Sequence, residues 1–225
     1  GNSIEDIAQL CQYAKQFGVK VYVTLNVIVY EHEIDYCQKL ITQLYEAGVD
    51  ALIVQDMGVL KMDIPPIELH ASTQTDNRTA DKVSWLKSLG FARVVLAREL
   101  SLDAIKAIHK EEPNVELEVF VHGALCVSYS GVCYVSQHSF GRSANRGECA
   151  QFCRMSFDLV DSDDREIEHQ RHLLSLKDMC RINELEQLAE AGATSFKIEG
   201  RLKDVSYVKN VVSAYRKKLD KVIAA

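Results

Sequence analysis

The sequence of 225 residues contains no apolar run of about 18 residues, the length that a membrane-spanning helix needs. No secretory signal peptide opens it. It nevertheless contains seven cysteines, and in a reducing compartment thiols serve as metal ligands or nucleophiles more often than as disulfides. The sequence therefore predicts a cytoplasmic protein with functional thiols and no membrane partner.

Several functional motifs are also missing. No glycine-rich phosphate loop follows an apolar run, which disfavours a doubly wound nucleotide-binding fold, and no His-Glu-x-x-His pattern supports a metalloprotease. The formal net charge of -6 argues against a broad nucleic-acid-coating surface, because such surfaces need clustered Lys and Arg. A local basic patch remains open.

A helix–glycine–strand unit recurs along the chain. Glycine ends an amphipathic helix just before an apolar run at Gly18, Gly48, Gly90 and Gly192, where it can close the last helical turn. The predicted strands cover residues 21–29, 51–54, 67–71, 93–97, 117–121 and 195–198. Nearly continuous apolar runs that alternate with helices are typical of parallel strands buried on both faces.

This pattern predicts an α/β fold, a (β/α) TIM-like barrel with six of its eight parallel strands. The chain opens with a helical pattern from Ile4, so two strands are expected to be missing from the amino end, and we expect the strand edges left unpaired to promote self-association. We predict one partial barrel domain, residues 1–225, with a Cys-rich insertion at residues 123–180. Polar residues follow the predicted strands, where barrels build active sites. The candidate catalytic residues are His70, Arg98, His122, Glu199 and Arg201.

Four cysteines gather within 28 residues of the predicted insertion. They are Cys126, Cys133, Cys149 and Cys153. Thiolates suit an iron–sulfur cluster, Zn or Cu(I), and the absence of two tight Cys-x-x-Cys pairs disfavours a structural zinc site. Two reactive dithiols, or buried free thiols, remain the alternative.

The other three cysteines are interpreted differently. Cys11 and Cys37 fall on apolar helix faces and are predicted to be core residues. Cys180 follows a short strand-like stretch, residues 172–176, and is the one plausible substitute ligand.

Residues 118–136 resemble the signature of the collagenase-like peptidase family U32, with Glu118, Phe120, Gly123 and the first two clustered cysteines at its fixed positions. The likeness covers nearly the whole chain, including residues 67–74, 145–147 and 196–201. The chain looks most similar to the branch that hydroxylates a cytidine of large-subunit ribosomal RNA.

This resemblance implies an RNA-modifying hydroxylase that acts on ribosomal RNA by cytidine 5-hydroxylation. It also implies a [4Fe–4S] cluster on the four clustered cysteines at the barrel mouth, and prephenate as co-substrate. Oxygen insertion into a pyrimidine needs chemistry that ordinary side chains lack, so a cofactor is expected on chemical grounds as well.

Two other functions stay open at this point. A collagenase-like peptidase would need a cysteine nucleophile beside a histidine, and Cys126 with His122 is the pair closest in sequence. A module stabilised by Zn, binding RNA or a protein partner, is the second alternative. In an oxygen-exposed preparation, Zn or empty thiols could also replace a cluster.

Overall fold

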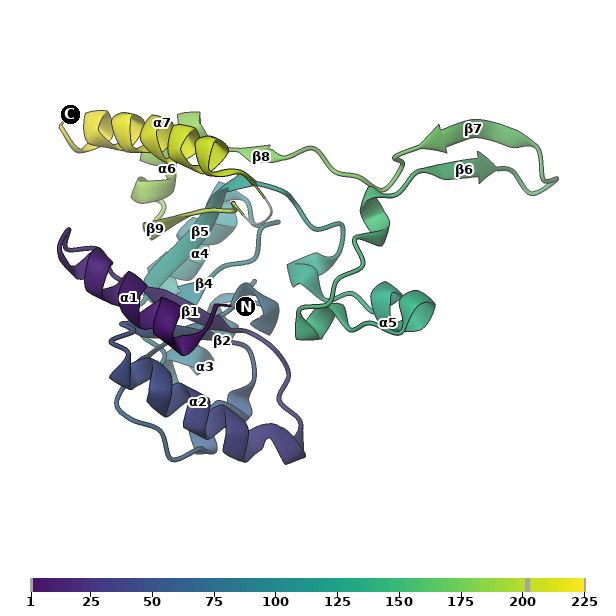
Figure 1. Ribbon diagram of the computed structural model, residues 1–225. Helices are drawn as coiled ribbons and strands as arrows, with labels where there is room; N and C mark the ends of the chain where they lie inside the picture. Colours follow the sequence, from purple (N-terminus) through teal and green to yellow (C-terminus); the bar gives the residue numbers. More distant parts are fainter. Residues whose placement is uncertain (1, 201–202, 225) are drawn as a thin grey trace. The chain divides into compact units, whose positions relative to one another are not determined.

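The computed structural model describes residues 2–200 and 203–224, which form a mixed α/β protein (Figure 1). The chain divides into two compact units. The first comprises Gly1–Val119 and Gln187–Phe196, and the second comprises Phe120–Glu186 and Lys197–Ala225. The predicted insertion, residues 123–180, falls within the second unit, and the description of 1–225 as one barrel domain stays a prediction.

The first unit is built on a parallel sheet. Its strands pair in chain order and are β1 (Tyr22–Leu25), β2 (Ala51–Val54), β3 (Glu68–Ala71), β4 (Arg93–Val95) and β5 (Glu116–Gly123). A further strand, β9 (Ala193–Ile198), pairs with β5, and the last four residues of β5 and the last two of β9 belong to the second unit. These six strands coincide with the six predicted from the sequence. β1, β3 and β4 are shorter than predicted, β2 has the predicted bounds, and β5 and β9 are longer.

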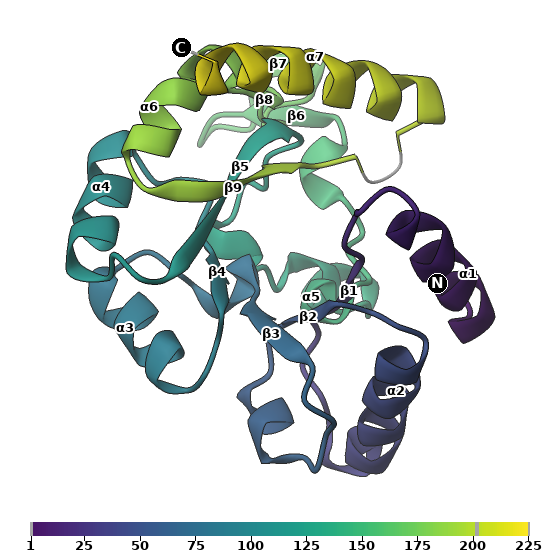
Figure 2. The same ribbon diagram turned by 90° about the vertical axis from the view of Figure 1, so that its left-hand side faces the viewer.

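Helices cover one side of this sheet (Figure 2). They are α1 (Ile4–Lys15), α2 (Ile34–Glu46), α3 (Ala80–Ser88), α4 (Leu102–Glu111) and the short α6 (Leu185–Glu190). Ile41, Leu86 and Ile108 on three of these helices are fully or almost fully buried, as is Leu52 on β2. Burying one such side chain stabilises the fold by about 1.5–3 kcal/mol, which fixes the helices on the sheet.

The predicted TIM-like barrel is not confirmed beyond this mainly parallel α/β sheet. Within residues 2–200 and 203–224 the strand order starts at β1, which pairs with β2 only, so the sheet does not close. None of the described helices is both long and apolar enough to cross a bilayer.

The second unit contains short elements and one long helix. Its helices are α5 (Val135–Phe140) and α7 (Val205–Ile223), and β6 (Phe157–Val160) pairs with β7 (Glu166–Arg171) in an antiparallel hairpin. A two-residue strand, β8 (Met179–Cys180), pairs antiparallel with the end of β5. The prediction of a strand-like stretch at residues 172–176 is wrong, because β7 ends at Arg171 and β8 begins only at Met179.

Asn77 joins the carboxyl ends of two strands in the first unit. Its fully buried amide Nδ2 donates to the carbonyl oxygens of Ser72 and Val95, both at 2.8 Å. Its Oδ1 accepts from the hydroxyl of Thr75 at 2.7 Å. Asn77 therefore fixes the loop after β3 against the end of β4.

Replacing Asn77 by alanine should lower the free energy of unfolding by about 2–4 kcal/mol, because two buried carbonyl groups lose their donor. Asn114→Ala, at an exposed position, should change it by less than about 0.5 kcal/mol. Urea unfolding of both variants measures the difference, and equal stability of the two would contradict this role of Asn77.

Candidate functional site

The four clustered cysteines lie in the second unit, in a segment of turns between β5 and β6. We call residues 123–154 the cysteine segment. Cys126 comes three residues after the end of β5, and Cys153 lies in a 3-10 turn, Phe152–Arg154. Cys126, Cys133 and Cys153 are half-buried and Cys149 is exposed. Cys11 and Cys37 are buried, as predicted for core residues.

Two polar contacts connect the parts of the segment that carry these thiols. The Arg154 guanidinium donates to the Leu125 carbonyl at 2.6 Å, and its other terminal nitrogen lies 3.8 Å from the Cys153 sulfur. The Ala150 amide donates to the Ser136 hydroxyl at 3.0 Å. The chain around Cys126 is thus joined to the chain around Cys153. In the same way, the helix after Cys133 is joined to the residue after Cys149.

The donor set of this segment fits a thiolate-bound cluster. The Gln151 amide donates to the Cys149 sulfur at 3.4 Å, and a guanidinium faces the Cys153 sulfur. N–H groups that point at sulfur tune iron–sulfur clusters, and a nearby cation offsets their negative charge.

Among the described residues, no three of these cysteines bring their sulfurs within 4.8 Å of one another. One group of three His, Cys, Asp or Glu side chains in the described ranges has its ligand atoms within 4.8 Å of one another. It is the exposed group Asp158, Glu166 and His169 on the β6–β7 hairpin. Convergence of the four cysteine sulfurs on one centre therefore stays a prediction.

His122 has well-defined partners in the second unit. It is the last residue but one of β5, and its carbonyl accepts from the Glu199 amide at 2.8 Å. Its ring Nε2 lies 2.9 Å from the Tyr207 hydroxyl and its Nδ1 lies 3.4 Å from the Tyr215 hydroxyl, both on α7. The structure thus brings two predicted site residues, His122 and Glu199, next to each other.

The close approach of Glu199 depends on Gly123. Gly123 has a φ of +112°, and a Cβ atom there would lie 2.5 Å from the Glu199 carbonyl oxygen. Glycine is needed at this position both for its backbone angle and for the space.

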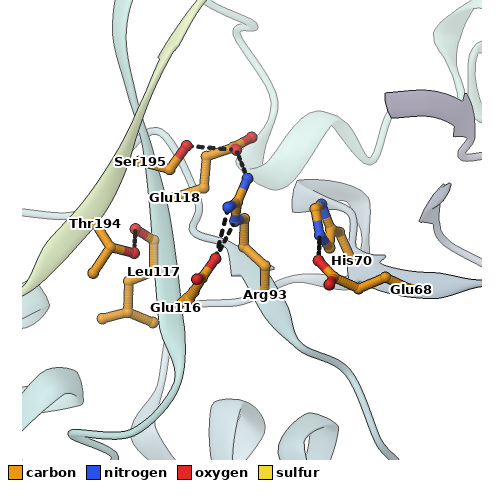
Figure 3. A network of polar contacts seen from close by, with 8 residues as sticks. All are labelled: Glu68, His70, Arg93, Glu116, Leu117, Glu118, Thr194 and Ser195. Carbon is orange, nitrogen blue, oxygen red and sulfur yellow. Dashed lines mark hydrogen bonds and ion pairs between the residues drawn. The ribbon is translucent and has the colours of Figure 1, made fainter. Parts of the chain in front are cut away.

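His70 lies in different surroundings, in the first unit. The ring is fully buried, and its Nε2 lies 2.6 Å from the Glu68 carboxylate (Figure 3). The Tyr22 ring packs against the His70 ring, with the two ring centroids 4.8 Å apart. Its Nδ1 is buried without a hydrogen-bond partner in the described structure. Burial lowers the pKa of His70, and its contact with Glu68 opposes that effect only in part. The neutral ring therefore donates from Nε2 and leaves a lone pair on Nδ1.

A network of charges that sequence reasoning missed lies near His70. Arg93 contacts Glu116 at 2.6 Å and Glu118 at 3.4 Å, and the Ser195 hydroxyl donates to Glu118 at 2.9 Å (Figure 3). Arg93 begins β4, Glu116 begins β5, and His70 is in register with Arg93. His70 is the third of the four residues of β3, and it pairs with Ile53, the third residue of β2, and with Arg93, the first residue of β4. The one sequence signal that pointed to this network was Glu118, which occupies a fixed position of the family signature.

Of the two remaining candidate catalytic residues, Arg98 and Arg201, the structure describes only Arg98. Arg98 is half-buried and follows β4 by three residues, and Glu99 beside it is exposed. Arg201 lies outside the described residues. The sequence also predicts that His70, His122 and Glu199 face one shared cavity at the carboxyl ends of the strands. This stays a prediction, because these residues belong to different units.

Stability should fall as the pH drops below about 6.5, in part because of His70. The folded state holds this ring neutral, while the unfolded chain binds a proton at the ordinary histidine pKa. One such group changes the free energy of unfolding by at most about 1.4 kcal/mol per pH unit, and the loss ends below the folded pKa. Unfolding of His70→Gln between pH 7 and pH 5 should show a flatter pH dependence than the parent. His32→Gln, at an exposed position, should keep the pH dependence of the parent protein.

Gly123→Ala should destabilise the second unit more than Gly141→Ala. Both glycines have positive φ, at which alanine costs roughly 1–2 kcal/mol, but a Cβ at Gly141 meets no atom within 4 Å. The overlap with Glu199 should add about 1–3 kcal/mol. Thermal unfolding of the two variants tests this, and matching midpoints would show that the chain relaxes around the new methyl group.

Comparisons with known proteins agree with the sequence resemblance. The model of peptidase family U32 matches residues 1–225. The chain is 54% identical over 222 residues to the 23S rRNA 5-hydroxycytidine C2501 synthase of Escherichia coli. This alignment covers 99% of this chain and 34% of that protein. It is 38% identical to the tRNA hydroxylation protein P1 of Bacillus subtilis, covering 97% of this chain and 54% of that one. A collagenase of Porphyromonas gingivalis is 34% identical, covering 96% and 55%.

The chain therefore spans about a third to just over half of the length of these relatives. The match of the family model over all 225 residues agrees with the signature around Cys126 and Cys133. The chain belongs to peptidase family U32.

Proposed function

We propose that this chain is the cysteine-bearing part of an RNA hydroxylase, and that its reaction is the 5-hydroxylation of a cytidine in ribosomal RNA. The observation that carries the proposal is the 54% identity, over nearly all of the chain, to a protein named as a 23S rRNA 5-hydroxycytidine synthase. Relatives named as tRNA hydroxylation proteins at 38% and 28% identity support the same reaction class.

The proposal includes a [4Fe–4S] cluster on Cys126, Cys133, Cys149 and Cys153. When bound, the cluster would supply the redox or Lewis-acid chemistry that protein side chains lack. The thiols would hold it, and Arg154, which faces the Cys153 sulfur, would balance part of its negative charge.

Prephenate is proposed as the co-substrate that provides the oxygen. Its carboxylates require cationic partners, and arginine binds a carboxylate through two parallel N–H groups. Arg98, which follows β4 by three residues, is one candidate partner, and Arg201, which lies outside the described residues, is an alternative one. RNA would be bound through a local basic patch, since the chain as a whole carries a net charge of -6.

Peptide hydrolysis is the second candidate, because a relative is named as a collagenase. It would require an imidazole that activates the Cys126 thiol. Both ring nitrogens of His122 are instead directed at hydroxyl groups of α7, which disfavours His122 as that base. A Zn-stabilised module that binds RNA or a protein partner is the third candidate, and its metal content would distinguish it.

The decisive experiment is anaerobic purification of the full-length protein with quantification of iron and sulfide. Hydroxycytidine in ribosomal RNA is measured by mass spectrometry in cells that lack the gene and carry each variant. Cys→Ser at each of the four clustered positions should remove iron and hydroxycytidine together. Cys11→Ala and Cys37→Ala remove thiols from the core and should retain both.

Other outcomes would change the proposal in defined ways. Iron retained after Cys153→Ser but lost after Cys180→Ser would make Cys180 the fourth ligand. A colourless protein with zinc would favour the binding module, and peptidase activity without metal would favour the protease. Full hydroxylation in all four serine variants would contradict the role of the cluster.

A further inference from the structure

Two tyrosines of α7 hold the ring of His122 from both nitrogens. Tyr207 lies in the first turn of the helix, where its amide donates to the capping Asp204 carboxylate at 2.8 Å, and Tyr215 lies eight residues later on α7. Their hydroxyls are 2.9 Å from Nε2 and 3.4 Å from Nδ1 of the ring. Tyr215 is buried and Tyr207 is half-buried, so the Tyr207 side of the ring is the more accessible one.

The direction of these hydrogen bonds follows from Tyr215. A phenol has one hydrogen, and the Tyr215 hydroxyl donates it to the Val121 carbonyl at 2.7 Å. The Cys180 sulfur, at 3.9 Å, is a longer and weaker alternative acceptor. The Tyr215 oxygen therefore presents lone pairs to His122 Nδ1.

Two lone pairs facing each other would repel, so Nδ1 of His122 carries the hydrogen. In a neutral imidazole the other nitrogen is then an acceptor. Nε2 accepts the hydrogen of the Tyr207 hydroxyl at 2.9 Å. The backbone carbonyl of Val121 thus sets the direction of a chain of hydrogen bonds that runs from Tyr207 through His122 to Tyr215.

We propose that Tyr207 is the catalytic hydroxyl through which the substrate of the hydroxylation exchanges a proton with His122, while Tyr215 is a positioning residue. This inference rests on the proposed function for the identity of the substrate, but not for the direction of the hydrogen bonds. It assigns a role to two residues of α7 that the sequence did not single out.

Hydroxylation of cytidine C5 is a two-electron oxidation, and the proposed co-substrate, prephenate, would supply both the oxygen and the oxidising equivalents. The proton step that follows is redox-neutral: once C5 carries the new hydroxyl group, its C5–H bond breaks and the electron pair of that bond returns to the pyrimidine ring. The proton passes to the Tyr207 oxygen as the Tyr207 hydrogen moves to His122 Nε2. The ring then carries hydrogens on both nitrogens. A base held in one orientation by a third group is the arrangement that general-base catalysis requires.

The direction of the hydrogen bonds is testable without any substrate. Nitrogen NMR of the full chain with labelled histidine should show His122 with its hydrogen on Nδ1 and a hydrogen-bonded Nε2. Tyr207→Phe should shift the Nε2 resonance and keep the hydrogen on Nδ1, whereas Tyr215→Phe should give a mixture of tautomers. A hydrogen on Nε2 in the parent chain, or an Nε2 resonance unchanged by Tyr207→Phe, would overturn the proposal.

The catalytic role is tested in the full-length protein. Tyr207→Phe should lower kcat by about 10²–10⁴-fold, the usual contribution of general acid–base catalysis, with the KM for RNA and the iron content unchanged. Tyr36→Phe removes an exposed hydroxyl on α2 and should retain kcat. Full kcat in Tyr207→Phe would overturn the role of this hydroxyl. If the parent protein forms no hydroxycytidine at all, the proposed function fails together with this catalytic role, while the NMR result still decides the direction of the bonds.

Discussion

The backbone of β5 is the constraint on which most of the described structure depends. Its carbonyl groups accept hydrogen bonds from several directions along one strand: Leu96 donates to Glu118, Arg181 to Val121 and Glu199 to His122. A strand of eight residues thereby joins the parallel sheet, the short antiparallel β8 and the segment that follows β9. The first clustered cysteine follows the end of β5 by three residues.

The strands of the parallel sheet could be predicted because their sequence signal is strong. Buried parallel strands need continuous apolar runs, and the glycines that end the preceding helices have the positive φ that closes a helix. The β6–β7 hairpin and β8 lacked such a signal. Nearly all residues of β6 and β7 are exposed, and β8 has two residues, so neither burial nor periodicity marks them.

Strand stagger explains why the charged neighbours of His70 were not predicted. His70 was predicted at the carboxyl end of an apolar strand, and it is the third of the four residues of β3. Neighbouring strands in a sheared parallel sheet are offset, however, so that His70, third in β3, pairs with Arg93, the first residue of β4. Stagger is a property of pairing between strands, and one strand's sequence does not contain it. In the same way, spacing locates the clustered cysteines along the chain but not how near their sulfurs come, because the glycine-bearing loop between them has many conformations.

The contact of Arg93 with Glu118 limits how this protein can vary over evolutionary time. Both side chains are largely buried, so losing Arg93 withdraws its positive charge from the Glu118 carboxylate, while losing Glu118 leaves Arg93 with its contact to Glu116. Removing one member of a buried pair typically costs about 3–5 kcal/mol, a large part of the stability of an ordinary domain, while replacing both by apolar residues of similar volume is often neutral. The two positions are therefore expected to change together across distant lineages, with loss of Arg93 alone the more costly of the two single changes.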